Sequence, residues 1–150
     1  SGTLYYHFSS KEEVFSFLVK EGMKLLKNSA EQKIAHCNNT KDKLKAIMLI
    51  QIKAIVKYES VLSTIFSQIY GIEPRNKLCQ AEVEKYIKTI KNVIDEGIEK
   101  GEINKFNSRF IAYTIFSLTS SIMIYKKQTG KNYSIAEIYK ECEMSIFGEI

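Results

Sequence analysis

The first eleven residues combine side chains that can hydrogen-bond to phosphate. They include a hydroxyl, two phenols, an imidazole and an ammonium group, and phenol rings can also contact thymine methyl groups. Leu4 and Phe8 are four residues apart, so on a short helix they would face inward together. The polar residues in question are Thr3, Tyr5, Tyr6, His7 and Lys11. Their types permit contact with DNA, and the alternative interpretation is a small helical cap that only completes the fold.

A second chemically notable residue is Gln51, which lies on an otherwise apolar helical face with Ile47 and Ile55. Burying its amide without a partner would cost about 1–3 kcal/mol. Gln51 must therefore find a partner in the protein, in water or in a ligand. A bond to a helix carbonyl within a packed core would satisfy it as well as a pocket would.

Catalytic and metal-binding patterns are missing from the sequence. It contains no GxSxG, HExxH or phosphate-binding glycine loop, and its two histidines are far apart. The three cysteines are odd in number and share no short spacing, which favours neither disulfides nor a zinc site and suits a reducing cytoplasm. We therefore predict no enzyme activity, no metal and no cofactor. The net charge of +5 permits a nucleic-acid partner without establishing one.

The composition predicts an all-α protein, because one proline and seven glycines leave too few turn residues for a sandwich or barrel. Hydrophobic periodicity predicts helices over residues 3–8, from Ser10 to about His36, over 44–56, 61–70, 83–98 and 108–127, and from Ser134 onward. Ser10, Thr40 and Ser134 are the expected N-caps, and Gly71 and Pro74 are expected to close the fourth helix. In the helix after Ser10, the expected inward stripe is Val14, Leu18, Gly22 and Leu25, with Phe15 and Leu26 beside it.

The uncharged stretch from Phe110 to Tyr125 is too short and too rich in Ser and Thr to cross a bilayer, so we expect no membrane partner. Its apolar surface exceeds what one neighbouring helix could cover. Pairing it with the last helix across a two-fold axis would give a four-helix interface in a homodimer. The residues expected there are Ile111, Ile115, Leu118, Ile122, Ile138, Cys142 and Ile146. The Thr114, Ser117 and Ser121 stripe favours close helix contact, or alternatively faces a ligand.

The segment Gly2-Thr3-Leu4-Tyr5-Tyr6-His7-Phe8-Ser9-Ser10-Lys11-Glu12-Glu13 resembles the recognition helix and following helix start of the TetR family of bacterial transcriptional regulators. The stretch 94–103 is similar to the end of that family's seventh helix, and the last two helices resemble its dimerising pair. The resemblance implies a TetR-like helical bundle. It implies DNA contact by Gly2, Thr3, Tyr5, Tyr6, His7 and Lys11.

The resemblance also implies a division of the chain. Residues 1–20 would be the end of a helix-turn-helix DNA-binding domain, and residues 21–150 the effector-binding and dimerisation domain. Because two helices should precede the recognition helix, we expect the natural protein to have them and this chain alone not to bind operator DNA.

The family further implies a pocket for a small, largely apolar effector among the central helices. The expected lining is Ile47, Gln51, Ile55, Phe66, Tyr70, Tyr86, Ile90, Tyr113, Thr114 and Phe116. The function so predicted is that of a cytoplasmic regulator, most simply a repressor, that binds operator DNA as a dimer and is released by the effector. The alternative is a helical carrier or sensor dimer with no role on DNA.

Overall fold

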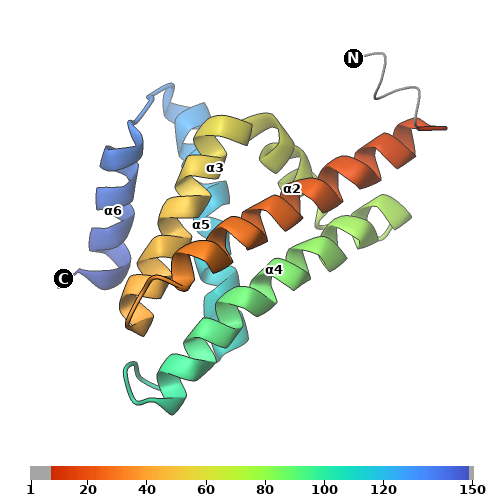
Figure 1. Ribbon diagram of the computed structural model, residues 1–150. Coiled ribbons are helices and arrows are strands. Elements are labelled where there is room, and N and C mark those ends of the chain that lie inside the picture. The colour runs from red at the N-terminus through yellow and green to blue at the C-terminus, as the bar shows by residue number, and fades with distance from the viewer. Residues whose placement is uncertain (1–7, 149–150) are drawn as a thin grey trace.

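The computed structural model describes residues 8–148, and in this part the chain is all helical, without strands. The helices are α2 (Lys11–Ile34), α3 (Thr40–Gln68), α4 (Pro74–Glu99), α5 (Ser108–Thr129) and α6 (Ile135–Phe147). Helix α3 is central because it packs against α2, α4, α5 and α6, while α2 lies alongside α4 (Figure 1). The predicted all-α fold is confirmed.

Helix α2 begins where the sequence predicts. The Ser10 hydroxyl oxygen accepts a hydrogen bond from the Glu13 amide at 3.2 Å. The Glu13 carboxylate does not return to Ser10 but accepts from the amide and hydroxyl of Ser9, at 2.6 and 2.8 Å. These bonds lower the pKa of Glu13, the Ser9 amide contributing most. The start of α2 is therefore held by two serines instead of one.

Helix α3 corrects two predictions. Its N-cap is Asn39, whose side-chain oxygen accepts from the Asp42 amide at 2.8 Å, and Thr40 is the buried first residue of the helix. The segments predicted as separate helices over 44–56 and 61–70 form one element with a kink at Tyr58, where φ is −129° and ψ is 38°. The break in hydrophobic periodicity corresponds to this kink, and no loop separates the two segments.

Helix α4 starts earlier than predicted, since Pro74 opens it instead of closing the helix before it. Proline suits the first helical position because its missing N–H would be unpaired there anyway. Near the other end, a Cβ on Gly97 would lie 2.5 Å from the Thr40 side chain. The Glu102 carboxylate accepts from the Thr40 amide at 2.6 Å. These contacts join the end of α4 to the start of α3.

The last two helices have the predicted boundaries. Asn107 caps α5 by accepting from the Phe110 amide at 3.1 Å, and Gly130 ends the helix with a φ of 67°, which favours glycine. Ser134 and Glu137 form a capping box at the start of α6.

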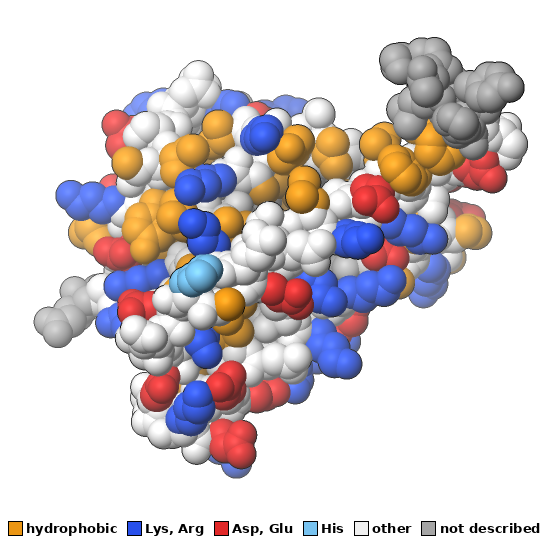
Figure 2. All heavy atoms as spheres, viewed as in Figure 1, with side chains coloured by type: hydrophobic (Ala, Val, Ile, Leu, Met, Phe, Trp, Pro, Cys, Tyr) orange, Lys and Arg blue, Asp and Glu red, His pale blue; other side chains and the backbone are white. Residues whose placement is uncertain are grey.

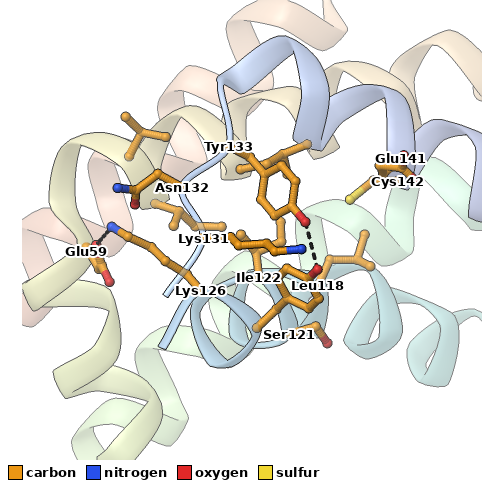
Figure 3. Close-up of a pocket in the computed structure, with 14 residues that line it drawn as sticks. Glu59, Leu118, Ser121, Ile122, Lys126, Lys131, Asn132, Tyr133, Glu141 and Cys142 are labelled. Atoms are coloured by element: carbon orange, nitrogen blue, oxygen red, sulfur yellow. Dashed lines mark hydrogen bonds and ion pairs between the residues drawn. The ribbon is translucent and has the colours of Figure 1, made fainter. Parts of the chain in front are cut away.

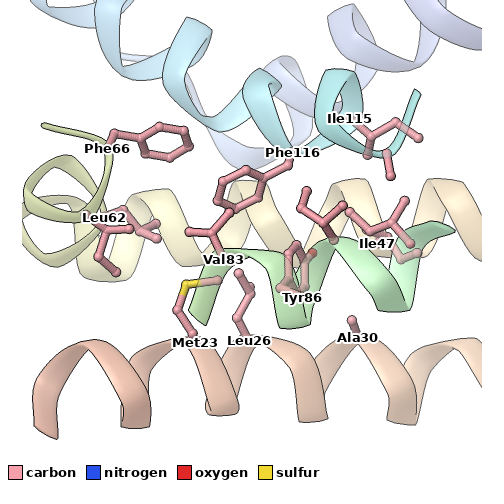
Figure 4. Close-up of a cluster of buried hydrophobic side chains, with 14 of the residues drawn as sticks. Met23, Leu26, Ala30, Ile47, Leu62, Phe66, Val83, Tyr86, Ile115 and Phe116 are labelled. Carbon is pink, nitrogen blue, oxygen red and sulfur yellow. The ribbon is translucent and has the colours of Figure 1, made fainter. Parts of the chain in front are cut away.

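The core lies between α2, α3, α4 and α5 (Figure 4). The rings of Phe66 and Phe116 stack with centroids 5.0 Å apart, and Tyr86 lies against Phe116 at 5.6 Å. Helix α2 contributes Val19, Met23, Leu26 and Ala30.

The predicted inward stripe of α2 is therefore wrong for two residues, Leu18 and Leu25, which are 44% and 52% exposed. The buried stripe is displaced around the helix because α2 packs against both α3 and α4. Across residues 8–148, none of the helices has the length and apolar content that crossing a membrane requires.

Candidate effector cavity

The buried amide of Gln51 is fully bonded within the protein. Its Nε2 donates to the Ile115 carbonyl at 2.9 Å and to the Thr119 hydroxyl at 3.2 Å. Its Oε1 accepts from the Tyr86 hydroxyl at 2.8 Å. Burial raises the pKa of the Tyr86 phenol, so this group stays protonated and donates. Gln51 thus joins α3, α4 and α5, and the partner that the sequence left open is the protein itself.

Most of the predicted effector-binding residues come together around this amide. Seven of them are buried in one region: Ile47, Gln51, Ile55, Phe66, Tyr86, Ile90 and Phe116. They pack against one another instead of enclosing an open space; of these seven, only Ile55 lines a cavity described below.

Three predicted residues lie elsewhere. Tyr70 is 87% exposed after the end of α3, so it does not join the buried group. Thr114 is exposed on α5, and its hydroxyl donates to the Phe110 carbonyl at 3.1 Å. The Tyr113 hydroxyl donates to the Glu84 carboxylate at the edge of the core. Periodicity places Tyr113 and Thr114 on a helix correctly, but it extends the helix to Tyr70 wrongly and does not give the direction of each side chain.

A cavity of about 720 Å³ lies between α3, α5 and α6 (Figure 3). Its apolar wall combines Ile55 and Val56 from α3, Leu118 and Ile122 from α5, and Ile138 and Cys142 from α6. Burial raises the pKa of the Cys142 thiol, which therefore contributes as a neutral group. The size is within the range of small-molecule sites, about 300–1,000 Å³.

The rim of this cavity is polar and carries lysines. Lys126 Nζ lies 2.7 Å from a Glu59 carboxylate oxygen, so one ion pair joins α3 to α5 across the cavity. Lys131 also lines the cavity, and within the described part of the chain it has no carboxylate partner. The Tyr133 hydroxyl donates to that of Tyr125 at 2.8 Å, and this bond raises the pKa of Tyr133.

Sequence reasoning missed these rim residues. Lys126 was visible only as a cation at the end of a helix. The loop that holds Lys131, Asn132 and Tyr133 follows no periodicity that could place it. The signal for these residues in the sequence is that basic and aromatic side chains occur on both sides of Gly130. The sequence alone does not show that this segment packs against α3.

The residues predicted for a dimer interface lie in different environments within one chain. Ile115 is buried in the core, and Cys142 is buried against Met48 and Ile52, so both are already covered within one chain. Leu118, Ile122 and Ile138 are half-buried and line the cavity, Ile111 packs at the core edge, and Ile146 is exposed.

The outward face of α5 instead carries Phe110, Thr114, Ser117, Ser121 and Ile124, all of them exposed. Phe110 and Ile124 are 67% and 58% exposed. The three residues in the middle of this face have small side chains, and the hydroxyls of Thr114 and Ser121 donate to carbonyls of their own helix. We call these five residues the α5 stripe.

Of the residues predicted to contact DNA, only Lys11 is described, as the exposed first residue of α2. Gly2, Thr3, Tyr5, Tyr6 and His7 lie outside the described residues. Helix α2 runs without interruption through residue 20, where the sequence placed a domain boundary. Within residues 8–148, no three His, Cys, Asp or Glu side chains group together as metal ligands would.

The sequence from residue 37 to 141 matches the family of tetracyclin repressor-like C-terminal domains. The match covers most of the chain, and the protein therefore belongs to this family, as the N-terminal motif predicts. No curated protein matches the chain in sequence.

Solved structures agree on the fold. A putative fatty acid metabolism regulator from Clostridium perfringens is 24% identical, with a TM-score of 0.90 over 99% of this chain and 82% of that one. FadR from Bacillus subtilis, solved with stearoyl-CoA, is 19% identical, with a TM-score of 0.82 over 99% of this chain and 82% of that one. AibR, solved with isovaleryl coenzyme A and operator DNA, is 16% identical, with a TM-score of 0.76 over 98% of this chain and 80% of that one. Two of these three structures are described as regulators.

Proposed function

We propose that this chain is the regulatory part of a dimeric TetR-family repressor whose effector is an acyl thioester of coenzyme A. The observation that carries the proposal is the cavity between α3, α5 and α6, with its apolar wall and its lysine rim. An acyl chain would lie against Ile55, Leu118 and Ile138. The anionic phosphates of coenzyme A would lie near Lys131 and Lys126, which attract negative charge. The ligands of the solved FadR and AibR structures support this ligand class.

The DNA-binding part of the proposal rests on the N-terminal motif. Residues Gly2, Thr3, Tyr5, Tyr6, His7 and Lys11 would contact operator DNA, and α2 follows them directly. A shift of α2 on effector binding would change the spacing of the two recognition helices, which must fit major grooves about 34–36 Å apart. Operator affinity would then fall.

The α5 stripe supports a homodimer. Small, internally bonded residues in its middle allow close helix approach, and Phe110 and Ile124 at its ends supply apolar area. We expect a dimer by light scattering at micromolar concentration. Ser117→Glu should convert it to a monomer, whereas Lys127→Glu, which is exposed on a different face of α5, should leave it dimeric. A wild-type monomer would contradict the proposed interface.

Calorimetric titration with isovaleryl-CoA, stearoyl-CoA and free coenzyme A tests the effector proposal. At least one acyl-CoA should bind more tightly than free coenzyme A. Ile138→Phe should weaken acyl-CoA binding by filling the cavity, and Ile146→Phe, which is exposed on the same helix, should not.

Lys131→Gln should weaken binding by roughly two- to fivefold, as expected for one exposed ion pair, and the exposed Lys127→Gln should leave it unchanged. Equal affinity of both Ile variants would refute the site.

A further inference from the structure

A second hollow, separate from the effector cavity, lies between α2 and α3. Its volume is about 640 Å³, and it shares no lining residue with the first cavity. We call it the α2–α3 groove. It is lined from α2 by Leu18, Glu21, Gly22, Leu25, Leu26 and Ser29, and from α3 by Ile50, Lys53, Ala54, Lys57, Tyr58, Val61, Leu62 and Ile65.

The floor of the groove is apolar and open to solvent. Leu18 and Leu25 on α2 and Tyr58 on α3 are between 41% and 52% exposed, although all three are large hydrophobic residues. Gly22 lies between the two leucines, and a Cβ placed there would be 3.7 Å from Val61 Cγ1. The groove therefore exists partly because α2 has no side chain at its middle position. Nothing in residues 8–148 covers this apolar area.

Two lysines line the α3 side of the groove. Lys53 and Lys57 are four residues apart, so their ammonium groups leave the same face of the helix. Within residues 8–148 neither is paired with a carboxylate, and Lys57 Nζ lies 5.3 Å from the centre of the Tyr58 ring. Hydrophobic side chains and lysines occur together on the face that α2 and α3 present in Figure 2. Like charges at this spacing repel, and an anion between them would relieve the repulsion.

We propose that the α2–α3 groove binds an amphiphile with an unbranched apolar chain and an anionic head. The chain would lie along Leu18, Leu25 and Val61, and the head would lie between Lys53 and Lys57. Glu21 is the acidic residue of the lining, and it disfavours the anion from the α2 side. The proposal needs neither DNA binding nor the effector cavity, because it concerns different residues.

Dodecanoate is the probe, with dodecanol and dodecyltrimethylammonium as uncharged and cationic controls below their aggregation concentrations. Calorimetry should rank dodecanoate tightest. Lys53→Gln/Lys57→Gln should weaken dodecanoate binding by roughly tenfold, and Glu21→Gln should tighten it. The matched control is Lys20→Gln/Lys24→Gln, an exposed pair with the same spacing on α2 that does not line the groove. This pair should bind like the wild type.

A photoreactive diazirine derivative of dodecanoate then locates the site. Mass spectrometry should find the cross-links in the peptides of residues 18–29 and 50–65. Gly22→Leu should abolish them by filling the groove, and its helical melting curve shows whether the variant is folded; if it is not, the Lys53→Gln/Lys57→Gln variant, changed only at exposed positions, should reduce the cross-links instead. Cross-links confined to α5 and α6, or equal affinity of the Lys53/Lys57 variant and the wild type, would overturn the proposal.

Discussion

The hydrogen bonds of Gln51 make a quantitative prediction for stability. Replacing Gln51 by Leu keeps a similar volume but leaves the Tyr86 hydroxyl without its acceptor. Tyr86 is buried, with 1% of its surface exposed, so water cannot replace that acceptor. The Ile115 carbonyl keeps its bond within α5, and the Thr119 hydroxyl can turn to that carbonyl. The cost of Gln51→Leu is therefore set by one buried donor, about 1–3 kcal/mol.

Tyr86→Phe should cost a similar amount, because the Gln51 side-chain oxygen then loses its donor. In the double variant both partners are gone, so the free energies of unfolding should not add. We expect a coupling energy of at least about 1 kcal/mol from urea unfolding of the four proteins. Effects that add to within about 0.3–0.5 kcal/mol would refute the bonding described for Gln51.

Two further predictions concern glycines and pH. Gly22→Ala should raise the free energy of unfolding by about 0.5–1 kcal/mol, because the new Cβ makes only an ordinary contact with Val61. Gly97→Ala should lower it, because its Cβ would meet Thr40 at 2.5 Å; thermal melting of the two variants compares them directly. Hydrogen bonds from Thr40 lower the pKa of Glu102 below 4.5, so the stability that its charge contributes is present above pH 4.5 and is lost as pH falls through the folded-state pKa. Unfolding of Glu102→Gln and the wild type at several pH values should therefore show a difference that shrinks on acidification, and a constant difference would contradict this.

The sequence predicts the ends of the last two helices well because these depend on neighbouring residues. Ser134 with Glu137, Asn107 and Gly130 act as their residue types require. The kink at Tyr58 is predicted only as a gap, since apolar residues continue on both sides of it.

The candidate site was harder to predict because it depends on which helices meet. Gln51 was identified as a residue in need of a partner, but its partners come from 35 to 68 positions away in the chain. The sequence predicts that Leu118 and Ile138 face a second chain; within one chain they line a cavity together with the loop after Gly130. Periodicity predicts that a side chain is turned away from water, and only the packing shows what it meets.

The most direct test of the proposed function measures operator and effector binding together. An operator duplex is selected from random-sequence DNA with the full-length protein, and its affinity is followed by fluorescence anisotropy as acyl-CoA is added. We expect the operator dissociation constant to rise by about 5–150-fold, and saturating operator to weaken acyl-CoA binding by the same factor. If no duplex is enriched, or if operator affinity is unchanged at saturating acyl-CoA, the chain is not an effector-released repressor, and the first of these results favours a carrier or sensor.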